Sequence, residues 1–140
     1  MEGWRTAIEA ALAAPDCPHW LIGLAAGFAG TIAALTGLDT CGVNLSGISS
    51  SGKTLAQKLA ASVWGSPRIG VGLLQSMRTT ENALESLAQA SSGTVLALDE
   101  VAHVDGRVVG RMIYSIASGI GKARLNAQAT LRGRYVWQTF

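Results

Sequence analysis

The segment GISSSGKT, residues 47–54, lies between a short apolar run and a helical pattern. It matches G-x-x-x-x-G-K-[ST] at every fixed position, which are Gly47, Gly52, Lys53 and Thr54. Glycines let such a loop curl and present backbone N–H groups, and the following helix adds the partial positive charge of its N-terminus. The segment is therefore suited to hold a chain of phosphates.

The polar side chains of this loop each have a predicted role. Lys53 carries a full positive charge that can reach the β- and γ-phosphates of ATP, and the Thr54 hydroxyl can ligate Mg²⁺. A plain Gly- and Ser-rich turn would explain the glycines but not the lysine and threonine in register. We therefore predict that ATP is bound by Gly47, Ser50, Ser51, Gly52, Lys53 and Thr54.

Two acidic residues follow a second apolar run, TVLAL, at residues 94–98. The run is typical of a strand buried on both faces of a parallel sheet, where ligands gather at the carboxyl ends of the strands. We predict that Asp99 binds Mg²⁺ and that Glu100 orients or deprotonates an attacking water. The alternative is that both are solvated loop residues. A base beside the metal ligand favours hydrolysis over transfer of phosphate to a substrate hydroxyl.

The composition indicates one globular domain, because 49% of the 140 residues are hydrophobic and only 14% are charged. Two cysteines and no secretory leader pattern predict a cytoplasmic protein. Residues 19–38 carry no fixed charge and approach the length of a membrane span. They are rich in glycine and alanine and lack a flanking basic cluster, so we expect a buried helix and no membrane contact.

Hydrophobic periodicity predicts helices near residues 4–13, 19–38, 53–64, 81–90 and 107–118, and strands near 42–46, 68–74, 94–98 and 134–140. Thr79 or Thr80 is expected to cap the helix at 81–90. The alternation of strands and helices predicts an α/β domain with a mostly parallel sheet.

A basic segment, residues 118–135, allows several interpretations. It could follow a nucleic-acid backbone, supply an arginine finger to a neighbouring subunit, contact phosphate through residues 119–122, or be a solvated loop. His103 could sense the γ-phosphate or lie in a polar loop. The candidate residues of the basic segment are Lys122, Arg124, Arg132 and Arg134.

Five stretches taken together resemble the family called domain of unknown function 927, found in bacterial, plasmid and phage proteins, often beside TOPRIM-type primase domains. These stretches are GISSSGKT with AASVWG, TTENALESLAQ, VLALDEVA, YSIASGIGKAR and RYVWQT, within residues 41–140. The resemblance implies a three-layer P-loop NTPase fold of RecA/AAA-like type. It also implies that residues 47–54 bind ATP, Asp99 binds Mg²⁺ and Glu100 is the catalytic base.

The expectation is thus an Mg-ATP-dependent ATPase module of a helicase or primase-helicase, acting on nucleic acid in the replication of mobile elements. Single-stranded DNA is the favoured partner, and a homo-oligomeric ring is expected of the full-length protein. Residues 1–40 are expected to form a helical segment that packs on an incomplete core, residues 41–140. Because the family's last strand continues beyond this point, we expect the chain to end within the domain and to hydrolyse ATP poorly alone. The alternatives are a nucleotide-binding module without turnover and a P-loop kinase for a small molecule.

Overall fold

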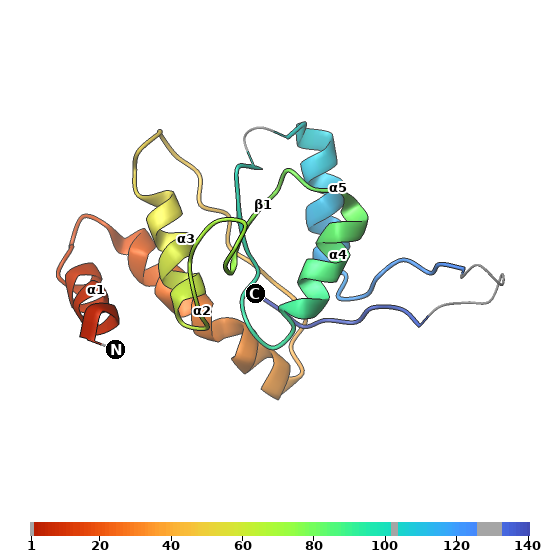
Figure 1. The fold of residues 1–140 in the computed structure, drawn as a ribbon, viewed down its shortest axis with the longest axis horizontal. Coiled ribbons are helices and arrows are strands. Elements are labelled where there is room, and N and C mark those ends of the chain that lie inside the picture. Colours follow the sequence, from red (N-terminus) through yellow and green to blue (C-terminus); the bar gives the residue numbers. More distant parts are fainter. Residues whose placement is uncertain (1, 102–103, 126–132) are drawn as a thin grey trace.

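A computed structural model describes residues 2–101, 104–125 and 133–140 (Figure 1). Within this part of the chain, two short strands pair in parallel, and Ser76 of one lies opposite Asp99 of the other. Helices α2 and α3 lie on one side of these strands, and α4 and α5 lie on the other (Figure 1). The elements are α1 (Glu2–Leu12), α2 (Pro18–Thr36), α3 (Lys53–Ser62), β1 (Leu74–Ser76), α4 (Glu81–Ala90), β2 (Ala97–Asp99) and α5 (Gly106–Ala117).

Both faces of β2 are covered, because successive side chains of a strand point in opposite directions. Ala97 packs with Ala61 of α3 and with Leu74. Leu96 and Leu98 pack on the other side, where the buried side chains are Met77, Leu84 and Met112. Of the strand expected at residues 94–98, only Ala97 and Leu98 lie in β2, which continues to Asp99. The side chains of the apolar run nevertheless pack on both sides of it, as expected of a strand buried on both faces.

The five predicted helices are confirmed, each within two residues of its expected bounds. Thr80 caps α4 by accepting a hydrogen bond of 3.2 Å from the Ala83 N–H. Asp105 caps α5 by accepting from two N–H groups of its first turn, a cap that was not predicted from the sequence. Gly37 ends α2 in the left-handed conformation, at φ 70°, where its N–H donates to the Ala33 carbonyl.

The strand expected at residues 42–46 is wrong. In the described part of the chain, no backbone hydrogen bond joins these residues to a neighbouring segment, and Val43 is 52% exposed. Just before this stretch, a side chain rather than the backbone contacts the C-terminal segment. The Thr40 hydroxyl donates to the Trp137 carbonyl at 3.3 Å and accepts from the Thr139 N–H at 3.4 Å. The stretch that leads into the loop at residues 47–52 is thus not part of a ladder.

The strand expected at residues 68–74 is wrong except for its last residue. The Leu73 N–H donates to the Ser66 carbonyl at 2.8 Å, and the Gly70 N–H donates to the Leu74 carbonyl at 3.0 Å. A Cβ at Gly72 would lie 2.3 Å from the Ser66 oxygen, so glycine is needed for this compact turn. The glycines that weakened the strand prediction are the residues that fold the segment back on itself.

The C-terminal segment, residues 134–140, pairs with two other segments without forming an assigned strand. The Phe140 N–H donates to the Thr94 carbonyl at 3.3 Å, and the Leu96 N–H donates to the Phe140 carbonyl at 2.9 Å. This pattern is that of a parallel pair. β1 pairs further along the chain, with Ala97–Asp99, and the Met77 N–H that follows β1 donates to the Asp99 carbonyl at 2.8 Å. Residues 138–140 therefore lie beside residues 93–96, the segment that leads into β2.

Helix α2 approaches its neighbours closely through three glycines. A Cβ on Gly23 would lie 2.2 Å from the Ala56 oxygen of α3, and one on Gly27 would lie 2.8 Å from the Ala60 oxygen. A Cβ on Gly30 would lie only 1.6 Å from the oxygen of Thr94. These glycines therefore allow contact between backbones, the use that small residues have at close helix packing.

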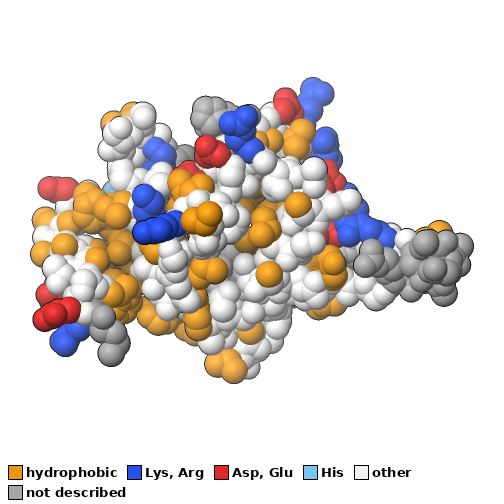
Figure 2. Space-filling model, in the orientation of Figure 1, with side chains coloured by type: hydrophobic (Ala, Val, Ile, Leu, Met, Phe, Trp, Pro, Cys, Tyr) orange, Lys and Arg blue, Asp and Glu red, His pale blue; other side chains and the backbone are white. Residues whose placement is uncertain are grey.

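The opposite side of α2 is apolar and open. Hydrophobic side chains gather over α1 and α2 in Figure 2. In the described residues, α2 is long and apolar enough by length and composition to cross a membrane, and 22% of that stretch is buried. The exposed large side chains of α2 are Leu21, Ile22, Phe28, Ile32 and Leu35.

Replacing Gly30 by alanine should destabilise the protein, because the new methyl group would meet the Thr94 backbone. We expect a loss of about 2 kcal/mol in the free energy of unfolding, typical of overpacking, measured by urea denaturation. Gly110→Ala is the matched control, since Gly110 lies within α5 and nothing lies within 4 Å of the position that its new methyl group would take. The control should gain about 0.5–1 kcal/mol from helix propensity. Equal effects of the two substitutions would contradict the packing assigned to α2.

Candidate functional site

The loop at residues 47–52 is curled by three residues with positive φ. Gly47 has φ 148°, Ser50 has φ 60° and Gly52 has φ 82°. Gly52 is also the residue that directly precedes α3, so the loop runs straight into the helix N-terminus. The glycines take these angles without steric cost, whereas Ser50 is held in a conformation that non-glycine residues rarely adopt. The predicted glycines therefore do what the motif requires of them.

The Lys53 ammonium lies inside this loop. Its Nζ donates to the Gly47 carbonyl at 3.0 Å, to the Ile48 carbonyl, and to Ser51 Oγ at 3.1 Å. The loop thus folds around its own cation, with carbonyl oxygens turned toward the charge. A phosphate oxygen offers this ammonium a stronger, charged acceptor than a carbonyl does.

Thr54 and Asp99 meet across the edge of the sheet. The Thr54 hydroxyl donates to Asp99 Oδ2 at 3.0 Å, although the two residues are 45 positions apart. Thr54 lies in the first turn of α3, and Asp99 is the last residue of β2. The structure therefore brings together two side chains that the sequence assigned to one metal.

A hydroxyl and a carboxylate are oxygen ligands of the kind that Mg²⁺ prefers. Among the described residues, no group of three or more His, Cys, Asp and Glu could hold a metal by itself. Thr54 and Asp99 fit such an ion by their chemistry.

Glu100 has an unusual backbone and a side chain that is already engaged. Its φ of 64° lies in the left-handed region, and its N–H donates to Asp99 Oδ1 at 2.8 Å. Its carboxylate accepts a hydrogen bond from Ser76 Oγ, at the carboxyl end of β1. Strained non-glycine residues of this kind cluster at functional sites. Ser76 was not predicted from the sequence, since only the parallel register of β1 and β2 places it opposite Asp99.

Two of the four basic candidates contact acidic residues of α4. Arg124 Nη2 donates to Glu85 Oε2 at 2.6 Å, and Glu85 is only 2% exposed. Lys122 donates to Glu81, one helical turn earlier on the same face. A Cβ on Gly121 would lie 3.0 Å from Glu85 Oε2, so glycine lets the chain approach that carboxylate. The segment Gly-Lys-Ala-Arg, residues 121–124, is therefore attached to α4 by these ion pairs and hydrogen bonds.

The acids that receive these bases belong to the stretch TTENALESLAQ, and they were not predicted as partners from the sequence. Their spacing of four residues on one helix was the available indication. Blue and red side chains, which are basic and acidic residues, lie next to each other on the right of Figure 2. Arg134 is exposed. Arg132 and His103 lie outside the described residues.

The contact with Lys122 also affects the titration of Glu81. The hydrogen bond and charge of Lys122, followed by the more distant Arg111 at 3.6 Å, hold the pKa of Glu81 below its ordinary value of 4.5. A carboxyl group whose pKa is lowered by folding stabilises the folded state above its unfolded pKa. That contribution is lost as the pH falls through the lowered value.

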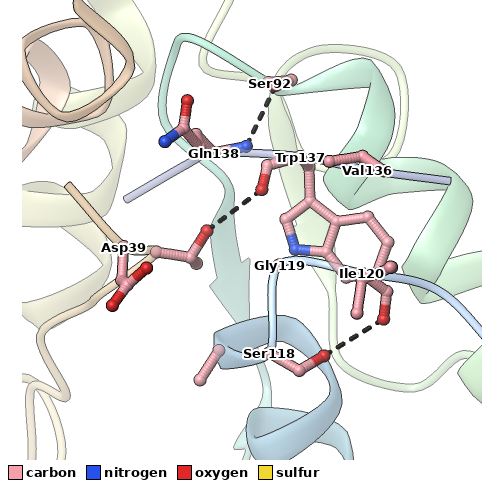
Figure 3. Close-up of a pocket in the computed structure, with 10 residues that line it drawn as sticks. Asp39, Ser92, Ser118, Gly119, Ile120, Val136, Trp137 and Gln138 are labelled. Atoms are coloured by element: carbon pink, nitrogen blue, oxygen red, sulfur yellow. Dashed lines mark hydrogen bonds between the residues drawn. The ribbon is translucent and has the colours of Figure 1, made fainter. Parts of the chain in front are cut away.

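A cavity of about 430 Å³ lies at the other end of the strands (Figure 3). Ser92, which lines it, precedes β2, whereas Asp99 ends β2. Its hydroxyl groups bond within the protein, since Ser118 donates to the Ile120 carbonyl and Ser92 accepts from the Gln138 N–H. The cavity is therefore separate from the loop and its acids.

A family model described as "Domain of unknown function (DUF927)" matches residues 1–135. The chain therefore belongs to this family. The match includes α1 and α2, so it extends further than the resemblance within residues 41–140. No curated protein and no solved structure matches the chain.

The backbone strain at Glu100 can be measured with two substitutions. Glu100→Gly and Glu100→Ala both remove the carboxylate and its bond to Ser76, but only glycine takes φ 64° without cost. We expect the glycine variant to be about 1 kcal/mol more stable than the alanine variant, by urea denaturation. Equal or reversed stabilities would mean that residue 100 is not held in the left-handed conformation.

Removing the Arg124 side chain should leave the buried Glu85 carboxylate without its ion-pair partner, with only the Lys122 backbone N–H still donating to it. We expect Arg124→Ala to lower the free energy of unfolding by about 3 kcal/mol, as for a broken buried ion pair. Lys122→Ala is the control, and it should have a much smaller effect because its partner lies near the surface. If both variants unfold at the wild-type urea concentration, the segment is not fastened to α4 by these pairs.

Proposed function

We propose that this chain is the Mg-ATP-binding part of a P-loop ATPase. The observation that carries the proposal is the hydrogen bond of 3.0 Å between Thr54 and Asp99. This bond joins the last residue of the proposed phosphate-binding motif to the acidic residue that ends β2. Thr54 and Asp99 belong to different elements, so the bond is not part of the helix or of the strand pairing. In this proposal the hydroxyl and the carboxylate are both ligands of the one ion that accompanies ATP.

The proposed fold is a three-layer P-loop NTPase of RecA/AAA-like type. Its support is the presence of helices on both sides of a parallel pair of strands, with α3 packed on β2 through Ala61 and Ala97. Residues 138–140 add a third parallel segment beside residues 93–96, which lead into β2. Ligands of such sheets bind at the carboxyl ends of the strands, which is where Asp99 and Ser76 lie.

In this proposal the loop backbone and Lys53 hold the β- and γ-phosphates, and Thr54 and Asp99 hold Mg²⁺. The bound ion would neutralise charge that develops on the transferred phosphoryl group. Lys53 must release the Gly47 and Ile48 carbonyls before it can contact phosphate. Glu100 is the proposed base, which would accept a proton from the water that attacks the γ-phosphate.

A partner for the ATPase is proposed from the family resemblance, as a helicase or primase-helicase acting on single-stranded DNA. Because Lys122 and Arg124 are engaged by acids of α4, a direct role in binding a nucleic-acid backbone falls first to Arg132 and Arg134. DNA-stimulated hydrolysis would support this partner, and a loss of salt dependence on replacing the two arginines would identify its contacts.

A second candidate function is nucleotide binding without turnover. It is favoured by one contact, the hydrogen bond that Ser76 donates to the Glu100 carboxylate. A base that is already engaged is less available to a water molecule. A third candidate, a small-molecule kinase, would turn over ATP only when a hydroxylated acceptor is supplied.

Two substitutions separate binding from hydrolysis. Lys53→Ala should weaken Mg-ATP binding at least tenfold, because it removes the cation that contacts the β- and γ-phosphates. Glu100→Gln should keep the affinity and lower hydrolysis by about 10²–10⁴-fold, the usual contribution of a general base. Affinity is measured by calorimetry and hydrolysis by phosphate release, with and without single-stranded DNA.

Lys58→Ala is the matched control for the lysine, since Lys58 is an exposed residue of the same helix. It should bind and hydrolyse Mg-ATP as the wild type does. Hydrolysis by Glu100→Gln at the wild-type rate would remove Glu100 from its proposed role. Binding by wild type without any phosphate release, with or without DNA and acceptors, would favour the second candidate.

A further inference from the structure

The first turn of α2 lies directly against the phosphate-binding loop. A Cβ on Gly52 would lie 2.6 Å from Nε1 of Trp20 and 3.1 Å from Nε2 of His19. Gly52 immediately precedes Lys53, whose ammonium lies inside the loop. Two ring nitrogens of α2 therefore lie at the end of the loop that carries the lysine.

These two nitrogens are buried, and neither has a hydrogen-bond partner among the described residues. The other tryptophans each have one. Trp4 donates to Ser62 Oγ at 3.1 Å, Trp64 to the Gly27 carbonyl at 2.6 Å, and Trp137 to the Ile116 carbonyl at 2.8 Å. An unpaired buried polar group is costly and uncommon, so a pair of them side by side calls for an explanation.

The two rings are also arranged as a unit. Their centroids lie 5.9 Å apart at an interplanar angle of 68°, an edge-to-face contact that favours fixed ring positions. Close packing of α2 on α3 through Gly23 and Gly27 holds the helix that carries them. An indole N–H and an imidazole Nε2, which donates when it carries the ring proton, are suited to a strong acceptor such as a phosphate oxygen when held beside this loop.

We propose that Trp20 and His19 are binding residues of the nucleotide site, and that their ring N–H groups donate to the phosphate chain of the bound nucleoside triphosphate. The inference rests on the proposed function and adds to it a contribution from outside the loop. Phosphate is the ligand group chosen because Gly52 and Lys53 form the phosphate-holding part of the motif. The residues lie in α2, which the family match includes.

The test compares Mg-ATP, inorganic tripolyphosphate with Mg²⁺, and adenosine as ligands of single variants. Trp20→Phe removes the N–H and keeps an aromatic ring, and it should weaken binding of Mg-ATP and of tripolyphosphate about tenfold or more. Adenosine binding should not change, because the contact is to phosphate. The thermal midpoint of the ligand-free protein should fall no further than in Trp4→Phe, since the lost N–H has no partner to leave unpaired.

The histidine allows a rescue experiment. His19→Leu should weaken binding of both phosphate ligands about tenfold, whereas His19→Gln, which keeps an N–H donor near the position of Nε2, should recover most of the affinity. Trp4→Phe is the binding control, because its N–H contacts Ser62, and it should bind Mg-ATP as the wild type does.

Wild-type affinity for tripolyphosphate in both Trp20→Phe and His19→Leu would overturn this inference and leave the proposed function intact. A loss of affinity accompanied by a thermal midpoint well below that of Trp4→Phe, without rescue by His19→Gln, would assign the pair a packing role and also overturn it. Failure of the wild type itself to bind Mg-ATP would instead refute the proposed function.

Discussion

Close backbone contact between α2 and α3 is the constraint on which the site depends. Gly23 and Gly27 bring α2 against the Ala56 and Ala60 carbonyls, and Gly30 brings it against residue 94. Because α3 is held on one side by α2 and on the other by the Ala61–Ala97 contact, its position on the strands is fixed. Its first turn then carries Thr54 to Asp99. A larger residue in place of these glycines would separate the layers, and the two ends of the site would move apart with them.

The site that results combines opposite charges at one edge of a small sheet. Lys53 lies in a loop of carbonyl oxygens, and the next residue, Thr54, donates to Asp99, which Glu100 follows. Glu100 shows the cost of this arrangement most clearly, since it takes a left-handed backbone that a carboxylate side chain does not favour. Ser76 and the Asp99 carboxylate hold it there. Strained non-glycine residues that their neighbours hold in this way cluster at functional sites.

The basic segment shows how a charged motif can have a structural partner within the chain. Arg124 and Lys122 find Glu85 and Glu81 on α4, so four charges that look independent in the sequence form one interface. Glu85 is only 2% exposed, and a buried carboxylate without an ion-pair partner is costly. Arg124 is therefore needed for the stability of the folded protein. Positive charge that is already paired in this way contributes less to the field that an approaching polyanion meets.

The sequence by itself determined the glycine-rich loop with its G-x-x-x-x-G-K-[ST] pattern, all five helices and the acidic residue that ends β2, because each depends on short-range rules. Glycine at positive φ, the Thr80 cap and helical periodicity are properties of neighbouring residues. The tertiary structure alone decided that residues 42–46 form no ladder, that Ser76 meets Glu100, and that Trp20 lies against Gly52. Those outcomes depend on which backbones approach one another across the fold, and such approaches are set by packing between distant segments rather than by any local pattern.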